Sequence, residues 1–330
     1  MAERSVTDAP LWLLTHHACT PGGLPLDSVW YAGMRQNGGG FPEMRLYGAQ
    51  SMIAPLRRVL VRRPDESFGE ADPQRWHYTA RPDLKRAQDE HDALVAILHS
   101  AGVEVLYHDI PQPGRADSIF VFDPAIVTNA GAIILRMSKN LRRGEEEAMA
   151  QRFAELDIPI LATLDGAALA EGGDILWLDE ETLAVGIGFR TNAEGFRQLT
   201  AALAPLGIRT LPVELPYHQG PEACLHLLSL ISIVDERLAV VYPPLISVPF
   251  YEELHRRGFR LVEVPDSEFP TMGPNVLALA PGQCLMLENN PLTKQRLEAA
   301  GCEVLTYCGN EISLKAEGGA TCLTRPILRG

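Results

Sequence analysis

The stretch that decides the fold is the end of the chain, 316-AEGGATCLTRPILRG-330. In it, Gly318 and Gly319 precede Thr321, Cys322 and a short run of residues with β propensity. Glycines directly before a strand let the backbone approach another group closely, and that group is often a ligand. Taken alone, the stretch favours a structural thiol, because free cysteine is among the most buried residue types. The rest of the chain changes that interpretation.

The composition describes a globular protein with a large core. The chain has 330 residues, a formal net charge of −13 and 46% hydrophobic residues, all within the globular range. No apolar run is long enough for a transmembrane helix, and an acidic chain without a basic stripe does not favour nucleic-acid binding. Six cysteines without a close C-x-x-C pair favour reduced thiols and a cytoplasmic location. We therefore expect a small-molecule partner, no nucleic acid and no membrane.

The first 50 residues differ from the rest in showing little periodicity. They contain PGG at 21–23 and GGG at 38–40, which indicates an irregular arm or a lid. His16, His17 and Cys19 also lie here, and without a second cluster they are expected to be solvated loop residues rather than metal ligands. The sequence thus predicts an arm over residues 1–50 and one catalytic domain over residues 51–330.

A repeated pattern runs through residues 51–330. In each copy a helix ends at a small or polar residue and a strand follows, as in 98-LHSAGVEVLYHDI-110 and 297-LEAAGCEVLTYCG-309. The break residues are Gly102, Asp157, Gly207, Gly258 and Gly301. Four of the five are glycine, which is the residue favoured after a helix where the backbone turns left-handed. The pattern predicts five similar units.

Each unit also has two β-rich runs around a turn before its helix, as in 172-GGDILWLDEETLAVGIGFR-190. The remaining pair is divided between the chain ends: 320-ATCLTRPIL-328 would pair with 51-SMIAPLRRVLVRR-63, which leads into a helix at 82–101. A first unit completed by the last strand closes a ring. The fold predicted is therefore α/β, with five ββαβ units around a central channel.

Polar residues recur at one position of these units, just before the first strand. The first complete unit has Asp117 and Asp123, and the next three have Glu171, His226 and Asn275. Cys322 takes this place at the C-terminus. A thiol, an imidazole and carboxylates that converge on one channel are the groups needed for nucleophilic catalysis. The G-x-G of 184-AVGIGFRT-191 lacks the later acidic residue of a dinucleotide fold, so no nucleotide cofactor is expected.

The chain resembles the guanidine-modifying (pentein) superfamily, and within it the dimethylarginine dimethylaminohydrolase family. The motifs that carry the resemblance run in family order: 117-DSIFVFDPAIVT-128, 141-LRRGEE-146, 171-EGGDILWL-178, 188-GFRTNAEG-195, 226-HLLS-229 and 318-GGATCL-323. The resemblance implies a five-bladed α/β propeller, the pentein fold, which agrees with the count of repeats. It also implies an enzyme without a metal or an organic cofactor.

The resemblance implies a role for each site residue. Cys322 would be the nucleophile and His226 the general acid and base, while Glu171 would bind the guanidinium and orient the imidazole. Asp123 would hold the guanidinium from the other side, and Asp117 would be a further substrate contact. Arg143 and Arg190 resemble the residues that bind the substrate α-carboxylate.

Two positions depart from related patterns. Phe122 stands where the family often has an acid, beside the guanidinium clamp, and this predicts that dimethylarginine is not the best substrate. Leu228 stands where arginine deiminases and amidinotransferases have aspartate, which argues against both of those activities.

We therefore expect a hydrolase that cleaves a C–N bond of a guanidino or amidino compound, with release of an amine and a ureido product. An amidinotransferase with the same covalent intermediate is the alternative enzyme. A non-catalytic binding protein on the same ring fold is the alternative from another class. The sequence leaves the substrate and a homodimer open.

Overall fold

The computed structural model describes residues 45–330, which form one compact unit. Most of the predicted arm, with His16, His17 and Cys19, lies outside the described residues. Residues 45–50, which the sequence assigns to the arm, lie along the C-terminal strand: the Gly48 amide donates to the Ile327 carbonyl at 2.7 Å, and the Arg329 amide donates to the Gly48 carbonyl at 2.8 Å.

The described residues contain five three-stranded sheets, in the orders β15–β1–β2, β3–β4–β5, β6–β7–β8, β9–β10–β11 and β12–β13–β14. In each sheet the middle strand is antiparallel to the first strand and parallel to the third. The strands are β1 (Leu56–Val61), β2 (Glu104–Tyr107), β3 (Ala125–Val127), β4 (Ala132–Ile134), β5 (Ile160–Thr163), β6 (Ile175–Asp179), β7 (Thr182–Ile187), β8 (Arg209–Glu214), β9 (Ile231–Asp235), β10 (Leu238–Val241), β11 (Arg260–Glu263), β12 (Leu277–Ala280), β13 (Gln283–Leu287), β14 (Glu303–Tyr307) and β15 (Arg325–Arg329). The predicted α/β class and the pairing of the two chain ends are confirmed.

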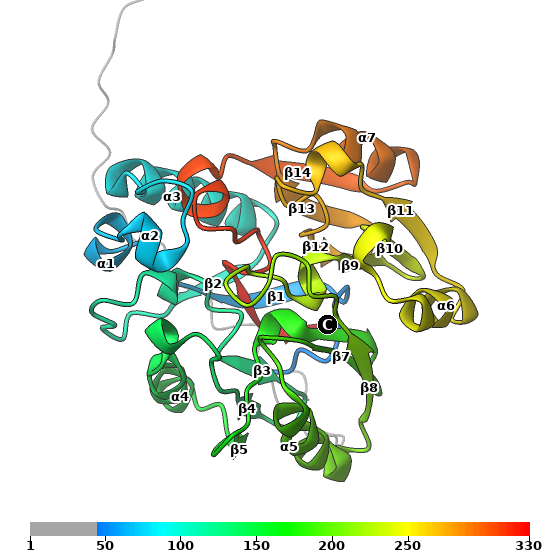
Figure 1. The fold of residues 1–330 in the computed structure, drawn as a ribbon, viewed down its shortest axis with the longest axis horizontal. Helices are drawn as coiled ribbons and strands as arrows, with labels where there is room; N and C mark the ends of the chain where they lie inside the picture. Colours follow the sequence, from blue (N-terminus) through cyan, green and yellow to red (C-terminus); the bar gives the residue numbers. More distant parts are fainter. Residues whose placement is uncertain (1–44) are drawn as a thin grey trace, which may run out of the picture. The chain divides into compact units, whose positions relative to one another are not determined.

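A helix crosses from the middle strand to the third strand of every sheet, and these helices lie towards the outside of the unit in Figure 1. They are α3 (Leu84–Ser100), α4 (Glu145–Glu155), α5 (Ala193–Leu203), α6 (Val248–Arg256) and α7 (Pro291–Ala299); the short α1 (Glu66–Gly69) and α2 (Pro73–Trp76) precede α3. The predicted break residues follow the helices, and all five have a positive φ, from 55° at Asp157 to 104° at Gly301. A left-handed residue after each helix turns the chain back into the sheet.

The core consists of five hydrophobic clusters, each drawn from two consecutive sheets. Alternate side chains of a strand point to opposite faces, so neighbouring residues enter different clusters. In β4, Ile134 packs with Leu60 of β1, whereas Ile133 packs with Trp177 of β6. The remaining clusters join β6 to β9, β9 to β13, and β12 back to β1. Both faces of the strands are buried, which explains why they read as continuous apolar runs.

Within residues 45–330 there is no helix with the length and apolar character needed to cross a membrane.

Candidate active site

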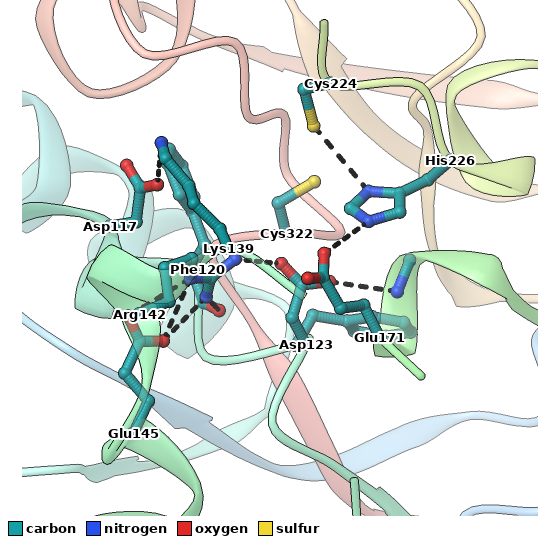
Figure 2. A network of polar contacts seen from close by, with 12 residues as sticks. Asp117, Phe120, Asp123, Lys139, Arg142, Glu145, Glu171, Cys224, His226 and Cys322 are labelled. Atoms are coloured by element: carbon teal, nitrogen blue, oxygen red, sulfur yellow. Dashed lines mark hydrogen bonds and ion pairs between the residues drawn. The ribbon is translucent and has the colours of Figure 1, made fainter. Parts of the chain in front are cut away.

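The segments that lie just before the first strand of each sheet bring the predicted polar residues together. Short 3₁₀ turns precede β3, β6 and β9: Ala116–Ile119, Gly172–Asp174 and Leu227–Ser229. Glu171 and His226 stand directly before two of these turns, and Asp117 lies within the first. Figure 2 shows Asp123, Glu171, His226 and Cys322 pointing toward one another.

Glu171 and His226 form a buried pair. His226 Nε2 lies 2.8 Å from Glu171 Oε2, and the other carboxylate oxygen accepts from the Ser138 amide at 2.8 Å and hydroxyl at 2.6 Å. Burial disfavours a charged imidazole, but the neighbouring Cys224 and Glu171 outweigh it and raise the pKa of His226 well above its usual value. Burial likewise opposes ionisation of Glu171, but the hydrogen bond from His226 holds its pKa well below the usual value.

The approach of the Glu171 segment to His226 requires a glycine. A Cβ on Gly173 would lie 2.4 Å from His226 Nδ1, far inside van der Waals contact. The same segment is tied to the His226 segment through Asp174, whose Oδ1 accepts from the Leu227 amide at 3.0 Å. The two glycines of 171-EGGD-174 therefore serve close packing of protein segments.

Cys322 lies in a turn three residues before β15. The Asn275 side chain, which holds the equivalent position before β12, bridges this turn: its Nδ2 is 3.4 Å from Cys322 Sγ, and its Oδ1 accepts from the Thr321 amide at 3.1 Å. Burial raises the pKa of the Cys322 thiol to about 12. Burial therefore favours the neutral thiol at pH 7.

Gly318 and Gly319 make this turn possible, but the groups they approach belong to the protein. A Cβ on Gly318 would lie 2.1 Å from the Phe120 ring, and one on Gly319 would lie 2.4 Å from Asn275 Oδ1. Close approach of the backbone was expected from the sequence. In the structure, the backbone at these two glycines approaches Phe120 and Asn275.

Both carboxylate oxygens of Asp123 accept hydrogen bonds from the protein. Its Oδ2 accepts from Arg142 Nη1 at 2.6 Å and its Oδ1 accepts from the Gly173 amide at 2.9 Å. Arg142 also pairs with Glu145 at 2.7 Å and donates to the Phe120 carbonyl at 3.1 Å. Two carboxylates therefore compensate the charge of the buried Arg142.

Asp117 belongs to a second network of hydrogen bonds, with Tyr78 and Lys139. Its two oxygens accept from the Tyr78 hydroxyl at 2.6 Å and from Lys139 Nζ at 2.7 Å. Lys139 Nζ also donates to the Trp76 carbonyl at 3.0 Å and lies 4.9 Å from the centre of the Trp76 ring. The ion pair with Lys139 neutralises the Asp117 carboxylate, which the sequence analysis predicts to contact the substrate.

Two cavities meet at these residues, with volumes of ≈ 40 Å³ and ≈ 230 Å³. Both are lined by Cys224, His226, Glu317 and Cys322. We call them together the substrate pocket. The smaller cavity also reaches Asp117, Phe120, Asp123, Lys139, Arg142, Glu171 and Arg190.

Phe122 is not part of this pocket, which corrects the role given to it from the sequence. Residues 120–123 form a turn in which the Asp123 amide donates to the Phe120 carbonyl at 3.4 Å. Residues three apart in such a turn share a side, so Phe120 and Asp123 line the pocket. The Phe122 ring lies on the opposite side, with Arg325 Cζ 3.6 Å from its centre. An acid at position 122 would face Arg325.

Of the two arginines predicted to bind the substrate carboxylate, one lines the pocket and the other does not. Arg190 lines the pocket, is 8% exposed and makes one long hydrogen bond, from Nη2 to the Ala223 carbonyl at 3.4 Å. Arg143 is not among the lining residues; its neighbour Arg142 is. The 3₁₀ turn Asn140–Arg142 ends there, and the side chain of Arg142 reaches Asp123 in the pocket.

The pocket residues that sequence reasoning missed include Phe120, Lys139, Arg142 and Cys224. Cys224 Sγ lies 3.7 Å from His226 Nδ1, the imidazole nitrogen not used by Glu171. Short-range signals existed for Cys224, which is two residues before His226, and for Arg142, which is next to Arg143. The five cysteines among residues 45–330 are all free thiols, and those residues hold no cluster of three side chains suited to a metal ion.

Comparisons with known proteins show the family to which the chain belongs. The family model described as N,N dimethylarginine dimethylhydrolase, eukaryotic, matches residues 73–329. The N(G),N(G)-dimethylarginine dimethylaminohydrolase of Streptomyces coelicolor is 31% identical over 270 residues, which cover 82% of this chain and 96% of that protein.

Two solved structures share the fold. A mutant of the Pseudomonas aeruginosa dimethylarginine dimethylaminohydrolase in complex with citrulline matches with a TM-score of 0.69 and 24% identity, over 82% of this chain and 99% of that one. The amidinotransferase SxtG of Microseira wollei, from the saxitoxin biosynthetic pathway, matches with a TM-score of 0.68 and 15% identity. The match covers 86% of this chain and 97% of that one.

Fold and sequence together place the chain in a class of hydrolases that act on carbon–nitrogen bonds of amidines. The chain belongs to the dimethylarginine dimethylaminohydrolase family.

Proposed function

We propose that the protein hydrolyses a C–N bond of a guanidino compound, through a covalent intermediate on Cys322, to an amine and a ureido product. The observation that carries the proposal is the convergence of Cys322, His226, Glu171 and Asp123 on one pocket. A guanidinium carbon is a poor electrophile, because its charge is spread over three nitrogens. The carboxylates of Glu171 and Asp123 hold the cation in place, so that the sulfur faces that carbon.

The protonation states of Cys322 and His226 fit this chemistry. Burial favours the neutral thiol at Cys322. A bound guanidinium brings a positive charge that favours the thiolate, and the thiol proton is lost to solvent. The thiolate then attacks the guanidinium carbon. Protonated His226 has one N–H on Nε2, which donates to Glu171, and a second on Nδ1, which lies 3.7 Å from Cys224 Sγ. The Nδ1 proton is the one available for transfer. Donation of this proton to the leaving nitrogen expels the amine and leaves an amidino-thioether on Cys322.

The second half of the reaction uses the same imidazole in reverse. Neutral His226 takes a proton from a water molecule, which attacks the carbon of the thioether. Collapse of that adduct breaks the C–S bond, restores the thiolate and releases the ureido product. Arg190 is available for a carboxylate at the far end of the substrate, because it forms no ion pair with a carboxylate among residues 45–330. Lys139, which pairs with Asp117, is a second cation in the lining of the pocket.

We further propose that the five sheet units are the blades of a five-bladed propeller around a central channel. The support is the order of the core clusters, which joins each sheet to the next and the fifth sheet to the first. A ring of this kind directs the start of every first strand to the same axis, where the polar residues meet.

Transfer of the amidino group to an acceptor amine is the second candidate, because an amidinotransferase shares the fold and the same covalent intermediate serves both reactions. Water and an amine compete for one intermediate, so the product mixture distinguishes them.

The test is a panel of arginine, methylated arginines and short guanidino acids, assayed for ureido product with and without an added primary amine. We expect ureido product in both cases and no new guanidino compound from the added amine. Cys322→Ser should abolish the product, whereas Cys302→Ser, a buried thiol outside the pocket, should retain it. Product from Cys322→Ser, or an adduct found on another cysteine by peptide mass spectrometry, would contradict the proposal.

A further inference from the structure

Arg325 and Arg329, the first and last residues of β15, line a cavity that shares no lining residue with the substrate pocket. The two residues are only 5% and 8% exposed. The rest of the lining is apolar apart from Ser51 and Thr321, and it includes no aspartate or glutamate. We call this cavity the arginine cavity.

The hydrogen bonds of the two guanidinium groups all go to backbone carbonyls. Arg325 Nη2 donates to Phe122 at 2.7 Å, and Arg329 donates to Ala54 at 2.7 Å and to Ala278 at 2.9 Å. The Nε atoms of both side chains are buried without any partner. Burial lowers the pKa of each group to about 9, so both remain protonated at pH 7.

Two other buried arginines, in contrast to Arg325 and Arg329, have carboxylate partners. Arg62 pairs with Asp65 at 2.8 Å, and Arg142 pairs with Asp123 and Glu145. Arg325 and Arg329, in contrast, form no ion pair with a carboxylate anywhere in residues 45–330. Burial of a charge without a counter-charge is strongly unfavourable. Two such cations in one apolar cavity call for an anion that residues 45–330 do not supply.

We propose that the arginine cavity binds a small inorganic anion of the size of chloride. The cavity volume is ≈ 20 Å³, which is room for one water molecule or an ion of about that size. A phosphate or an organic acid is too large for it. The two free Nε–H groups are the donors available to the anion, and Ser51 and Thr321 are the other polar side chains in the lining.

An anion at this site would stabilise the backbone next to the substrate pocket without contacting the substrate. Arg325 holds the Phe122 carbonyl at 2.7 Å, and the Phe122 amide donates to the Cys322 carbonyl at 3.2 Å. The same two segments carry Asp123 and Cys322. An anion that holds Arg325 in place therefore stabilises the backbone segments that carry Asp123 and Cys322. This effect does not depend on the identity of the substrate.

Diffraction from crystals of the whole chain grown in sodium bromide tests the site directly. We expect an anomalous bromide peak in contact with Nε of Arg325 or Arg329. A water molecule there, with no anomalous signal at high bromide concentration, would overturn the proposal.

Thermal unfolding gives a second measurement in solution. At equal ionic strength the thermal midpoint should be higher in sodium chloride than in sodium gluconate, since gluconate is too large for the cavity. Above saturation it should rise by about 2 °C for each tenfold increase in chloride. Arg329→Met should lose this dependence, while Arg57→Met should keep it, because Arg57 is exposed on the adjacent strand. Equal midpoints of the native chain in the two salts would count against the site. If Arg329→Met does not fold, the bromide peak decides.

Discussion

Phe120 and Phe122 lie on opposite sides of one turn. Phe120 packs over Gly318 and lines the pocket that holds Cys322. Phe122, two residues later, lies flat against the guanidinium of Arg325, with 3.6 Å between Cζ and the ring centre. The first ring is placed to contact a substrate, and the second supports the backbone behind it.

Substitution of these two residues should therefore have different effects. Phe122→Ala removes a buried ring and should destabilise the protein by about 3–5 kcal/mol, without changing the order of substrates in a panel of specificity constants. Phe120→Ala should change that order, because it removes a wall of the pocket. A change in substrate order with Phe122→Glu or Phe122→Ala, measured on folded protein, would restore the role first assigned to Phe122 from the sequence.

Loss of the imidazole should stop both half-reactions. We expect His226→Gly to lower turnover on the order of a hundred- to ten-thousand-fold, the usual contribution of one general acid or base. A trapped adduct on Cys322 should be visible by mass spectrometry if the first half-reaction still proceeds slowly. Exposed His255 provides the control variant, His255→Gly. Turnover close to normal in His226→Gly would remove His226 from the mechanism.

The carboxylate of Glu171 should set the protonation of His226. Burial lowers the pKa of His226, whereas Cys224 and Glu171 raise it, so Glu171→Gln removes one of the groups that favour the imidazolium. The limb of the pH–rate profile that reports protonated His226 should therefore move to lower pH, together with a fall in turnover. The measurement is kcat/KM from pH 5 to pH 10, with exposed Glu155→Gln as the control. An unchanged profile in Glu171→Gln would show that the pair is not coupled during catalysis.

The thiol of Cys322 should react slowly in the free enzyme. Burial raises its pKa to about 12, so the thiolate fraction is small at pH 7 and grows about tenfold for each pH unit. The rate of alkylation of Cys322 by iodoacetamide, followed by peptide mass spectrometry, should rise throughout the range from pH 7 to pH 10. A plateau below pH 8 would mean that the thiolate already exists without substrate.

Asp174 should make the protein less stable at neutral pH than in weak acid. Burial raises its pKa from 3.8 to about 6, so ionisation opposes the folded state. The cost is absent below about pH 4, grows between pH 4 and pH 6 and is complete above that range, where it reaches at most about 3 kcal/mol. Asp174→Asn keeps an oxygen for the Leu227 amide and should raise the thermal midpoint at pH 8 but not at pH 4. An equal change at both pH values would exclude ionisation as the cause.

The sequence by itself determined the α/β class, the five repeats and the pairing of the chain ends. These follow from local chemistry: left-handed residues after helices, turns between β-rich runs and apolar runs at strand length. Position within a repeat was also enough to identify Glu171, His226, Asn275 and Cys322 as neighbours, because equivalent positions of similar units converge.

Only the tertiary structure decided which way the side chains between these positions point. The turn at 120–123 sends Phe120 inward and Phe122 away, and the 3₁₀ turn at 140–142 presents Arg142 rather than Arg143. The spacing of residues in the sequence does not encode such turns. The charges of Asp117 and Arg142 are likewise neutralised by Lys139, Asp123 and Glu145. Whether a charged group is free or paired depends on distances in the folded chain, and these distances leave Arg190, Arg325 and Arg329 as buried cations without a carboxylate partner in residues 45–330.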